Sequence, residues 1–382
     1  MADRLKNFNS GRSNFYLLGF IALVLAGAVL KITAPVLLPF TIAVLLSFVL
    51  EPLVVVLERI RVPRVIGILL SILFIGAGLY LVGIILFSSG RTILTLYPKY
   101  EGRFSEIYSR IAPMFSLPYD EHLTFFQNLW GQLGLRIQVQ SLAFQLSESF
   151  LGFLKDALMV LLFTAFLLLE LSHFREKIEL AFEDKLSGRI KKAGSDVVNQ
   201  VARYLSVKFF ISLATGILVT LGLSLLKLDF PVVWGVVSFI LNFIPNIGSV
   251  AAGAGVGVFA LVQFWPAPGP IAGALAVMVG VNMVLGNVLE PKVQGDNLGL
   301  SPFVILVSML AWGWLWGFAG LILAVPMTVI VKIICENVPV LEPVSIILGS
   351  FRAAMRKKGT EPETPVQKGT ELEPPAGEDR NR

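Results

Sequence analysis

Polar and helix-breaking residues interrupt long apolar segments at three places in the second half of the chain. The first is F-I-P-N-I-G-S at Phe243–Ser249, the second is N-V-L-E-P-K-V-Q-G at Asn287–Gly295, and the third is L-S-P-F at Leu300–Phe303. An unpaired backbone group in lipid is costly, so broken helix is tolerated there only where it is buried in protein or lines an aqueous cavity. Helix ends and amide side chains at such breaks can hydrogen-bond a polar solute. The interruptions therefore predict a solute path.

The first interruption lies near the centre of the apolar segment 232–262, which is too long for one straight crossing. A re-entrant hairpin or a broken helix fits this pattern, and a proline kink with Asn246 capping a helix is the alternative. The predicted substrate path comprises Asn242, Pro245, Asn246, Gly248, Asn287, Glu290, Pro291, Gly295, Ser301 and Pro302, with Pro326 as a further residue that shapes the backbone.

Glu290 is the carboxylate most suited to chemistry, because it follows the apolar run 271–289. Ionisable groups at membrane depth tend to mark ion or substrate paths. Lys292 lies two residues further on, so an ion pair between Glu290 and Lys292 at a helix end accounts for the same residues. Both interpretations stay open from the sequence alone.

A second long apolar run, 302–331, contains W-G-W-L-W-G-F-A-G at Trp312–Gly320 and then Pro326. Its length again favours a hairpin. Trp-Gly pairs precede two prolines in this half of the chain, as Trp234-Gly235 before Pro245 and as Trp316-Gly317 before Pro326. Weak internal sequence similarity of this kind is typical of inverted repeats.

Composition places the chain in a membrane. Of its 382 residues, 55% are hydrophobic and 15% are charged, whereas soluble domains are roughly half apolar and a quarter charged. The apolar runs are continuous and not alternating, which favours helices. The net charge of +5 comes from basic residues that flank apolar runs, which indicates membrane orientation and no nucleic-acid partner.

The same composition excludes several kinds of chemistry. One cysteine and two histidines exclude an internal disulfide, a cysteine metal cluster and an H-E-x-x-H zinc site. No G-x-x-x-x-G-K-[ST] phosphate loop is present, so the chain does not hydrolyse ATP by that route. We therefore expect no cofactor, no metal site and no enzyme activity, and any pumping must use an ion gradient or the gradient of the solute.

The predicted fold is an all-α, polytopic integral membrane protein with about six to eight membrane helices, some of them broken or re-entrant. Residues 1–90 are expected to hold three membrane helices, with an uncleaved first helix, and residues 91–155 an amphipathic extramembrane domain. Residues 156–348 hold the other membrane helices and a basic cytoplasmic helical segment at 173–205, and 349–382 form a disordered cytoplasmic tail. Positive-inside counting places both termini in the cytoplasm.

Four motifs occur in order along the second half: F-I-P-N-I-G-S, N-x-x-E-P-x-x-x-G, G-L-S-P-F, and W-G-x-x-G-x-x-L-A-V-P. Together they resemble the autoinducer-2 exporter family of transporters, and the resemblance spans the chain. It implies a multi-helix permease of the bacterial inner (plasma) membrane, with export of autoinducer-2 assigned to some members and sodium/proton antiport to others. It also implies a homo-oligomer, with a pentamer among the expected states.

Three hypotheses about function follow. The first is a secondary transporter that exports a small polar solute, similar to autoinducer-2, for which amide groups and helix ends suffice. The second is a Na⁺(Li⁺)/H⁺ antiporter, which needs a titrating carboxylate, and Glu290 is the candidate. The third is a non-transporting membrane scaffold built around the domain at 91–155. The partners expected are a small molecule or an ion, membrane lipids, and further copies of the chain.

Overall fold

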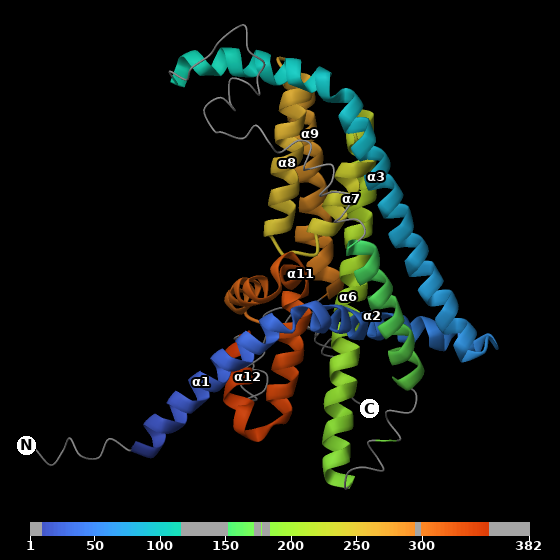
Figure 1. The fold of residues 1–382 in the computed structure, drawn as a ribbon, viewed down its shortest axis with the longest axis vertical. Coiled ribbons are helices and arrows are strands. Elements are labelled where there is room, and N and C mark those ends of the chain that lie inside the picture. Colours follow the sequence, from blue (N-terminus) through green and yellow to red (C-terminus); the bar gives the residue numbers. More distant parts are fainter. Residues whose placement is uncertain (1–9, 116–151, 172–176, 178–183, 295–298, 351–382) are drawn as a thin grey trace, which may run out of the picture.

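The computed structural model describes residues 10–115, 152–171, 177, 184–294 and 299–350, and Figure 1 shows their course. These residues are helical, apart from connections and an isolated bridge between Leu300 and Gly349. Within them, seven helices are long and apolar enough to cross a membrane. The predicted all-α, polytopic membrane fold with six to eight such helices is therefore confirmed.

The elements have the following bounds. They are α1 (Ser10–Ile32), α2 (Ala34–Arg59), α3 (Arg64–Ile111), η1 (Ala112–Phe115), a helix at Gly152–Leu171, α6 (Asp184–Leu225), α7 (Pro231–Leu241), α8 (Ile247–Phe264), α9 (Pro268–Val281), the π-helix η2 (Asn282–Leu289), α10 (Glu290–Gln294), α11 (Pro302–Asn337), η4 (Pro339–Leu341) and α12 (Glu342–Leu348).

Proline marks the start of several helices. Pro231, Pro268 and Pro302 are the first residues of α7, α9 and α11. The missing N–H of proline costs nothing in the first turn, where backbone donors have no helical acceptor, and its fixed φ suits a helix. Pro302, which belongs to an interruption found in the sequence, thus marks the start of a separate helix.

The long helix α6 links two hydrophobic clusters and runs lengthwise through the molecule (Figure 1). Its 42 residues extend for about 63 Å at 1.5 Å per residue. Val219 and Leu223 near its end pack with Ala252 of α8 and Ala274 of α9. Nearer its start, Val201 and Tyr204 pack with Leu45, Trp316 and Val329, so that this part of α6 is buried against α2 and α11.

The first predicted break is a helical hairpin. An added Cβ on Gly248 would lie 1.7 Å from the carbonyl oxygen of Leu241, so the chain reverses tightly between α7 and α8. At the other end of the hairpin, the backbone N–H of Asp229 donates to Oε1 of Gln263 at 2.7 Å. The 11 residues of α7 extend only about 16 Å, roughly half of a bilayer core. The predicted hairpin is confirmed, and the alternative of a single helix kinked at Pro245 is wrong.

A second hairpin lies within α11. Trp316 and Gly317 have non-helical backbone angles, with φ of +62° at Gly317. An added Cβ on Gly320 would lie 1.9 Å from the carbonyl oxygen of Trp312, whereas eight residues of straight helix separate their ends by about 12 Å. The expected hairpin is present. Trp234-Gly235 lies inside α7, while Trp316-Gly317 forms the turn itself. The two Trp-Gly pairs therefore do not occupy equivalent positions in the two hairpins.

Helix α3 reaches far beyond one membrane thickness. It continues without interruption through residue 90 to Ile111, and its last turns cross over the end of the α8–α9 pair (Figure 1). Residues 116–151, most of the expected amphipathic domain, lie outside the described residues, as do most of 172–183 and the tail from 351 onward. Residues 184–205 of the expected basic segment form the first half of α6.

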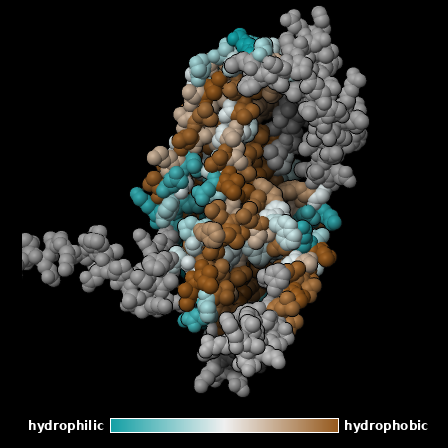
Figure 2. Space-filling view, turned by 90° about the vertical axis from the view of Figure 1, so that its left-hand side faces the viewer, coloured by the Kyte–Doolittle hydropathy of each residue, from teal (hydrophilic) through white to brown (hydrophobic). Residues whose placement is uncertain are grey.

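The surface carries the composition expected of a chain embedded in lipid. In Figure 2, hydrophobic residues cover most of the described surface in two zones, with hydrophilic residues gathered at the upper end and in a belt between the zones. Large apolar side chains such as Phe74, Val250 and Leu310 are more than two-thirds exposed. Such exposure of apolar area would favour aggregation in water, and a bilayer removes that cost.

Candidate functional site

The tip of the α7–α8 hairpin places polar groups inside an apolar helix bundle. Asn242 directly follows α7 and is only 7% exposed. Its amide Nδ2 donates to Oγ of Ser212 on α6 at 2.9 Å. A buried amide needs such a partner, because leaving it unpaired costs roughly 1–3 kcal/mol. The hydrogen bond therefore fixes the hairpin tip against α6.

A small hollow lies between this tip, α6 and the α9–η2 helix. Its lining residues are Thr215, Val219, Ser238, Asn242, Ser249, Ala252, Met278, Val281 and Asn282. The volume open to the centre of a water molecule is about 10 Å³, which is roughly the space for one water. Five of these residues carry a hydroxyl or an amide, and none is charged.

Glu290 pairs with a lysine that the sequence analysis did not single out. Nζ of Lys208 on α6 lies 2.6 Å from Oε1 of Glu290, and the two side chains are 4% and 15% exposed. Lys292 is exposed, and the pairing of Glu290 with Lys292 is wrong. Lys208, Ser212 and Thr215 recur at the spacing of one helix face, a pattern that marks a polar face but does not identify the partner of Lys208.

The second predicted break is a continuous helix with widened geometry. Helix α9, η2 and α10 run on from Pro268 to Gln294, and the N–H of Glu290 donates to the carbonyl of Leu285, five residues back. Proline removes a backbone donor and its ring crowds the carbonyl four residues earlier. A π-helical stretch before Pro291 relieves that crowding without ending the helix, so the expected break here is corrected to a π-helix.

The remaining predicted site residues are spread over the fold. Asn287 is exposed on the outer face of η2, and Pro291 is exposed as well. Pro245 is half-buried and Asn246 is exposed at the hairpin turn, where Asn246 makes no side-chain cap. Ser301 and Pro302 lie where α11 begins, beside Leu348 of α12. Gly295 lies outside the described residues, and Pro326 is buried within α11.

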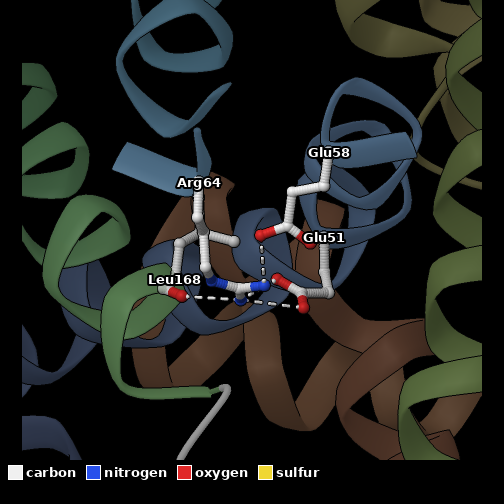
Figure 3. A network of polar contacts seen from close by, with 4 residues as sticks. All are labelled: Glu51, Glu58, Arg64 and Leu168. Carbon is white, nitrogen blue, oxygen red and sulfur yellow. Dashed lines mark hydrogen bonds and ion pairs between the residues drawn. The ribbon is translucent and has the colours of Figure 1, made fainter. Parts of the chain in front are cut away.

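A guanidinium joins three helices away from the hollow. Arg64 at the start of α3 contacts Glu51 at 2.9 Å, Glu58 at 3.2 Å and the carbonyl oxygen of Leu168 at 3.0 Å (Figure 3). Glu51 and Glu58 belong to α2, and Leu168 belongs to the helix at 152–171. Arginine suits this position because its rigid fork presents several donors at once.

The outer end of the hairpin is tied to α3. The carboxylate of Asp229 accepts hydrogen bonds from Nζ of Lys99 and from the hydroxyl of Tyr100, each at 2.6 Å. Burial alone would raise the pKa of Asp229, but these two hydrogen bonds outweigh it and hold the pKa below its ordinary value of 3.8. Arg103 adds a bond to the carbonyl of Trp265 at 3.1 Å.

Comparison with known proteins gives this arrangement a context. Residues 18–339 match the model of the AI-2E family transporters. The AI-2 transport protein TqsA of Escherichia coli K12 is 30% identical over 88% of this chain and 95% of its own length. A protein of Borreliella burgdorferi, named for transport without a substrate, is 42% identical over 52% of this chain and 55% of its own length.

A third relative carries a different activity in its name. The sodium-lithium/proton antiporter of Halobacillus andaensis is 27% identical over 50% of this chain and 52% of its own length. Groups of three or more residues that could hold a metal ion are absent from the part of the chain that the structure describes.

Proposed function

The chain belongs to the AI-2E family of transporters, and from this premise we propose that it exports a small polar solute of the autoinducer-2 kind as a secondary transporter. The single observation that supports the proposal best is the hairpin tip, where Asn242 and Ser212 form a buried polar contact inside an apolar bundle. Irregular backbone at membrane depth is tolerated where it lines a path or a cavity. The name of the Escherichia coli relative supports the choice of solute.

The proposed route follows one face of α6. Lys208, Ser212 and Thr215 succeed one another on that face, and each contacts or lines a polar feature of a neighbouring element. The distance along α6 from Lys208 to Thr215 is about 10 Å. A solute that moves along this face exchanges one set of hydrogen bonds for the next, while the surrounding side chains stay apolar.

A second candidate function is exchange of Na⁺ or Li⁺ for protons. The buried Lys208–Glu290 pair favours it, because an ionisable pair at membrane depth is expensive and tends to mark an ion path. The name of the Halobacillus relative points the same way. In this case Glu290 carries the ion and the hollow is a structural feature.

We further propose a location in the bacterial inner membrane, with both termini in the cytoplasm, and assembly into a homo-oligomer. Support for the orientation comes from the basic residues that flank the apolar runs. The exposed apolar faces leave room for contact with lipid or with a second copy of the chain.

Transport by purified protein in proteoliposomes tests both functions. We expect wild-type protein to move labelled autoinducer-2, and Glu290→Gln to leave that flux largely intact. If Na⁺-driven proton movement is found instead and Glu290→Gln removes it, the antiport function replaces export. Glu106→Gln, a change to a half-exposed carboxylate on the outer part of α3, is the control.

The double variant Lys208→Gln/Glu290→Gln guards against a folding defect, because it leaves no unpaired buried charge. Export predicts flux in this variant as well, because glutamine still donates and accepts hydrogen bonds along the route, whereas antiport predicts none. Wild-type protein that moves neither solute nor ions would contradict both functions and favour the scaffold.

A further inference from the structure

Ser238 is a buried hydroxyl that the protein leaves without a partner. It lies on α7, is 3% exposed, and lines the hollow at the hairpin tip. Its Oγ makes no hydrogen bond. A buried polar group without a partner is costly and unusual, and it calls for an explanation.

The other buried serine and threonine hydroxyls in the described part of the chain all have partners. Ser71, Thr164, Thr215 and Thr328 each donate to the carbonyl four residues back in their own helix. Ser47, Ser308 and Ser345 donate to the carbonyl three residues back, and Ser212 accepts from Asn242. Among the buried serines and threonines that the structure describes, Ser238 therefore differs from every other in having no partner.

The surrounding groups determine what kind of ligand fits. Thr215 uses its hydrogen on the carbonyl of Ile211, so its oxygen remains an acceptor. Asn242 uses one amide hydrogen on Ser212, so its amide oxygen remains an acceptor. Together with the hydroxyl of Ser238, the hollow offers both donors and acceptors. A solute hydroxyl, which donates and accepts at once, complements this set.

Charged ligands do not fit the same lining. The hollow contains no carboxylate to balance a cation and no basic side chain to balance an anion. Transferring an unpaired charge into such a site is far more costly than transferring a hydroxyl. The Lys208–Glu290 pair is internally neutral and does not supply a free charge.

We propose that the hollow binds one hydroxyl group of an uncharged solute and that Ser238 is the donor that selects it. This inference rests on the proposed export function and deepens it, since it names the class of substrate and adds Thr215, Ser238 and Asn282 to the site residues predicted from the sequence. The volume suits a single hydroxyl, so the rest of the solute lies outside the hollow as now shaped.

Gly286 supports the arrangement of Asn282. An added Cβ on Gly286 would lie 2.8 Å from Oδ1 of Asn282, so the side chain of Asn282 folds over this glycine. Gly286→Ala would displace the Asn282 amide without removing any polar group from the site. It therefore alters the shape of the site and not its chemistry.

Thiol protection tests the proposal without any transport measurement. Cys335 is the sole cysteine of the chain and is replaced by serine, and Ser249 at the rim is replaced by cysteine. The rate of alkylation by N-ethylmaleimide is then measured in the detergent-purified protein. The probes are glycerol, glycerate and 2-aminopropane-1,3-diol, which share a three-carbon skeleton and are neutral, anionic and cationic.

We expect glycerol to slow the alkylation and the two charged probes to have no effect at the same concentration. Ser238→Ala should raise the half-protecting concentration of glycerol about fivefold, the size expected for one lost hydrogen bond. Gly286→Ala should raise it as well. Ser308→Ala is the matched control, because Ser308 is a buried serine that bonds its own helix, and it should change nothing.

Several results would overturn the inference. Equal protection by all three probes would show that charge is not selected, and unchanged protection in Ser238→Ala would remove Ser238 from the site. If glycerol gives no protection, the hollow holds at most a structural water. If N-ethylmaleimide does not react under any condition, the hollow is closed to solutes. Protection without solute flux in proteoliposomes would contradict the export function and leave this site standing.

Discussion

Individual side chains in this protein gain their roles from partners that lie far away in the sequence. Lys208 and Glu290 are 82 residues apart and form an ion pair with little access to solvent. A buried pair contributes little net stability when intact, but removing one member leaves the other charged and unpaired. The two residues should therefore behave as a unit in mutagenesis.

The first prediction concerns this pair. Glu290→Gln should lower the free energy of unfolding by about 3 kcal/mol, and Lys208→Gln/Glu290→Gln should recover most of that loss. Denaturant unfolding of the purified protein, followed by tryptophan fluorescence, measures both. Additive losses in the double variant would show that the two side chains do not interact.

The stability of the protein should also depend on pH through Asp229. The hydrogen bonds from Lys99 and Tyr100 hold the pKa of Asp229 below 3.8. A carboxyl group with a lowered pKa in the folded state stabilises the protein above its unfolded pKa, and this contribution is lost as pH falls through the folded pKa. The unfolding temperature of wild-type protein should therefore drop more steeply below about pH 4 than that of Asp229→Asn. Parallel curves would show that Asp229 makes no such contribution.

At the scale of elements, the two hairpins depend on glycines where backbones meet. Gly248 approaches Leu241 across the first turn, and Gly320 approaches Trp312 across the second. Length and proline content favoured a hairpin in both apolar runs, with a proline kink left open as the alternative for the first. The sequence did not predict that residues 287–294 stay helical, because a π-helix that accommodates a proline leaves no pattern in the hydrophobicity.

Gly248→Ala tests the first turn. Its Cβ would lie 1.7 Å from a backbone oxygen, so the hairpin must open, and we expect a loss of about 3 kcal/mol in the free energy of unfolding. Gly253→Ala in the same helix meets its nearest heavy atom at 4.0 Å and should be neutral or stabilising by up to about 1 kcal/mol. Similar effects of the two changes would show that the close contact does not exist.

Substitution of Arg64 tests how much its contacts stabilise the junction of α2, α3 and the helix at 152–171. Arg64→Lys keeps the charge but cannot reach Glu51, Glu58 and the carbonyl of Leu168 together. These groups are partly solvated, so we expect a loss of only about 1 kcal/mol. Thermal unfolding at low and high salt measures it, and an unchanged midpoint at low salt would contradict this role.

Across the whole molecule, α6 is the element that the polar features share. It carries Lys208 of the ion pair and Thr215 of the hollow, and Asp229 lies just beyond its end. The sequence was sufficient for the membrane class and for a range of six to eight membrane helices, and it narrowed the first interruption to a hairpin, a broken helix or a kink, since these follow from hydrophobicity and from proline. It indicated Asn242 and Glu290 but gave neither their partners nor Ser238. Those depend on how α6, α7 and η2 pack, and an apolar run with scattered serines fits many packings.

Solute flux through the hairpin tip shows whether the buried polar residues there carry the solute. Asn242 is buried beside the hollow while Asn287 is exposed on the outer face of η2, so Asn242→Leu and Asn287→Leu make the same chemical change at two places. We expect Asn242→Leu to lower autoinducer-2 flux in proteoliposomes about tenfold, equivalent to roughly 1.4 kcal/mol, and Asn287→Leu to leave it near the wild-type rate. Equal flux in folded protein of both variants, or a loss confined to Asn287→Leu, would contradict this expectation.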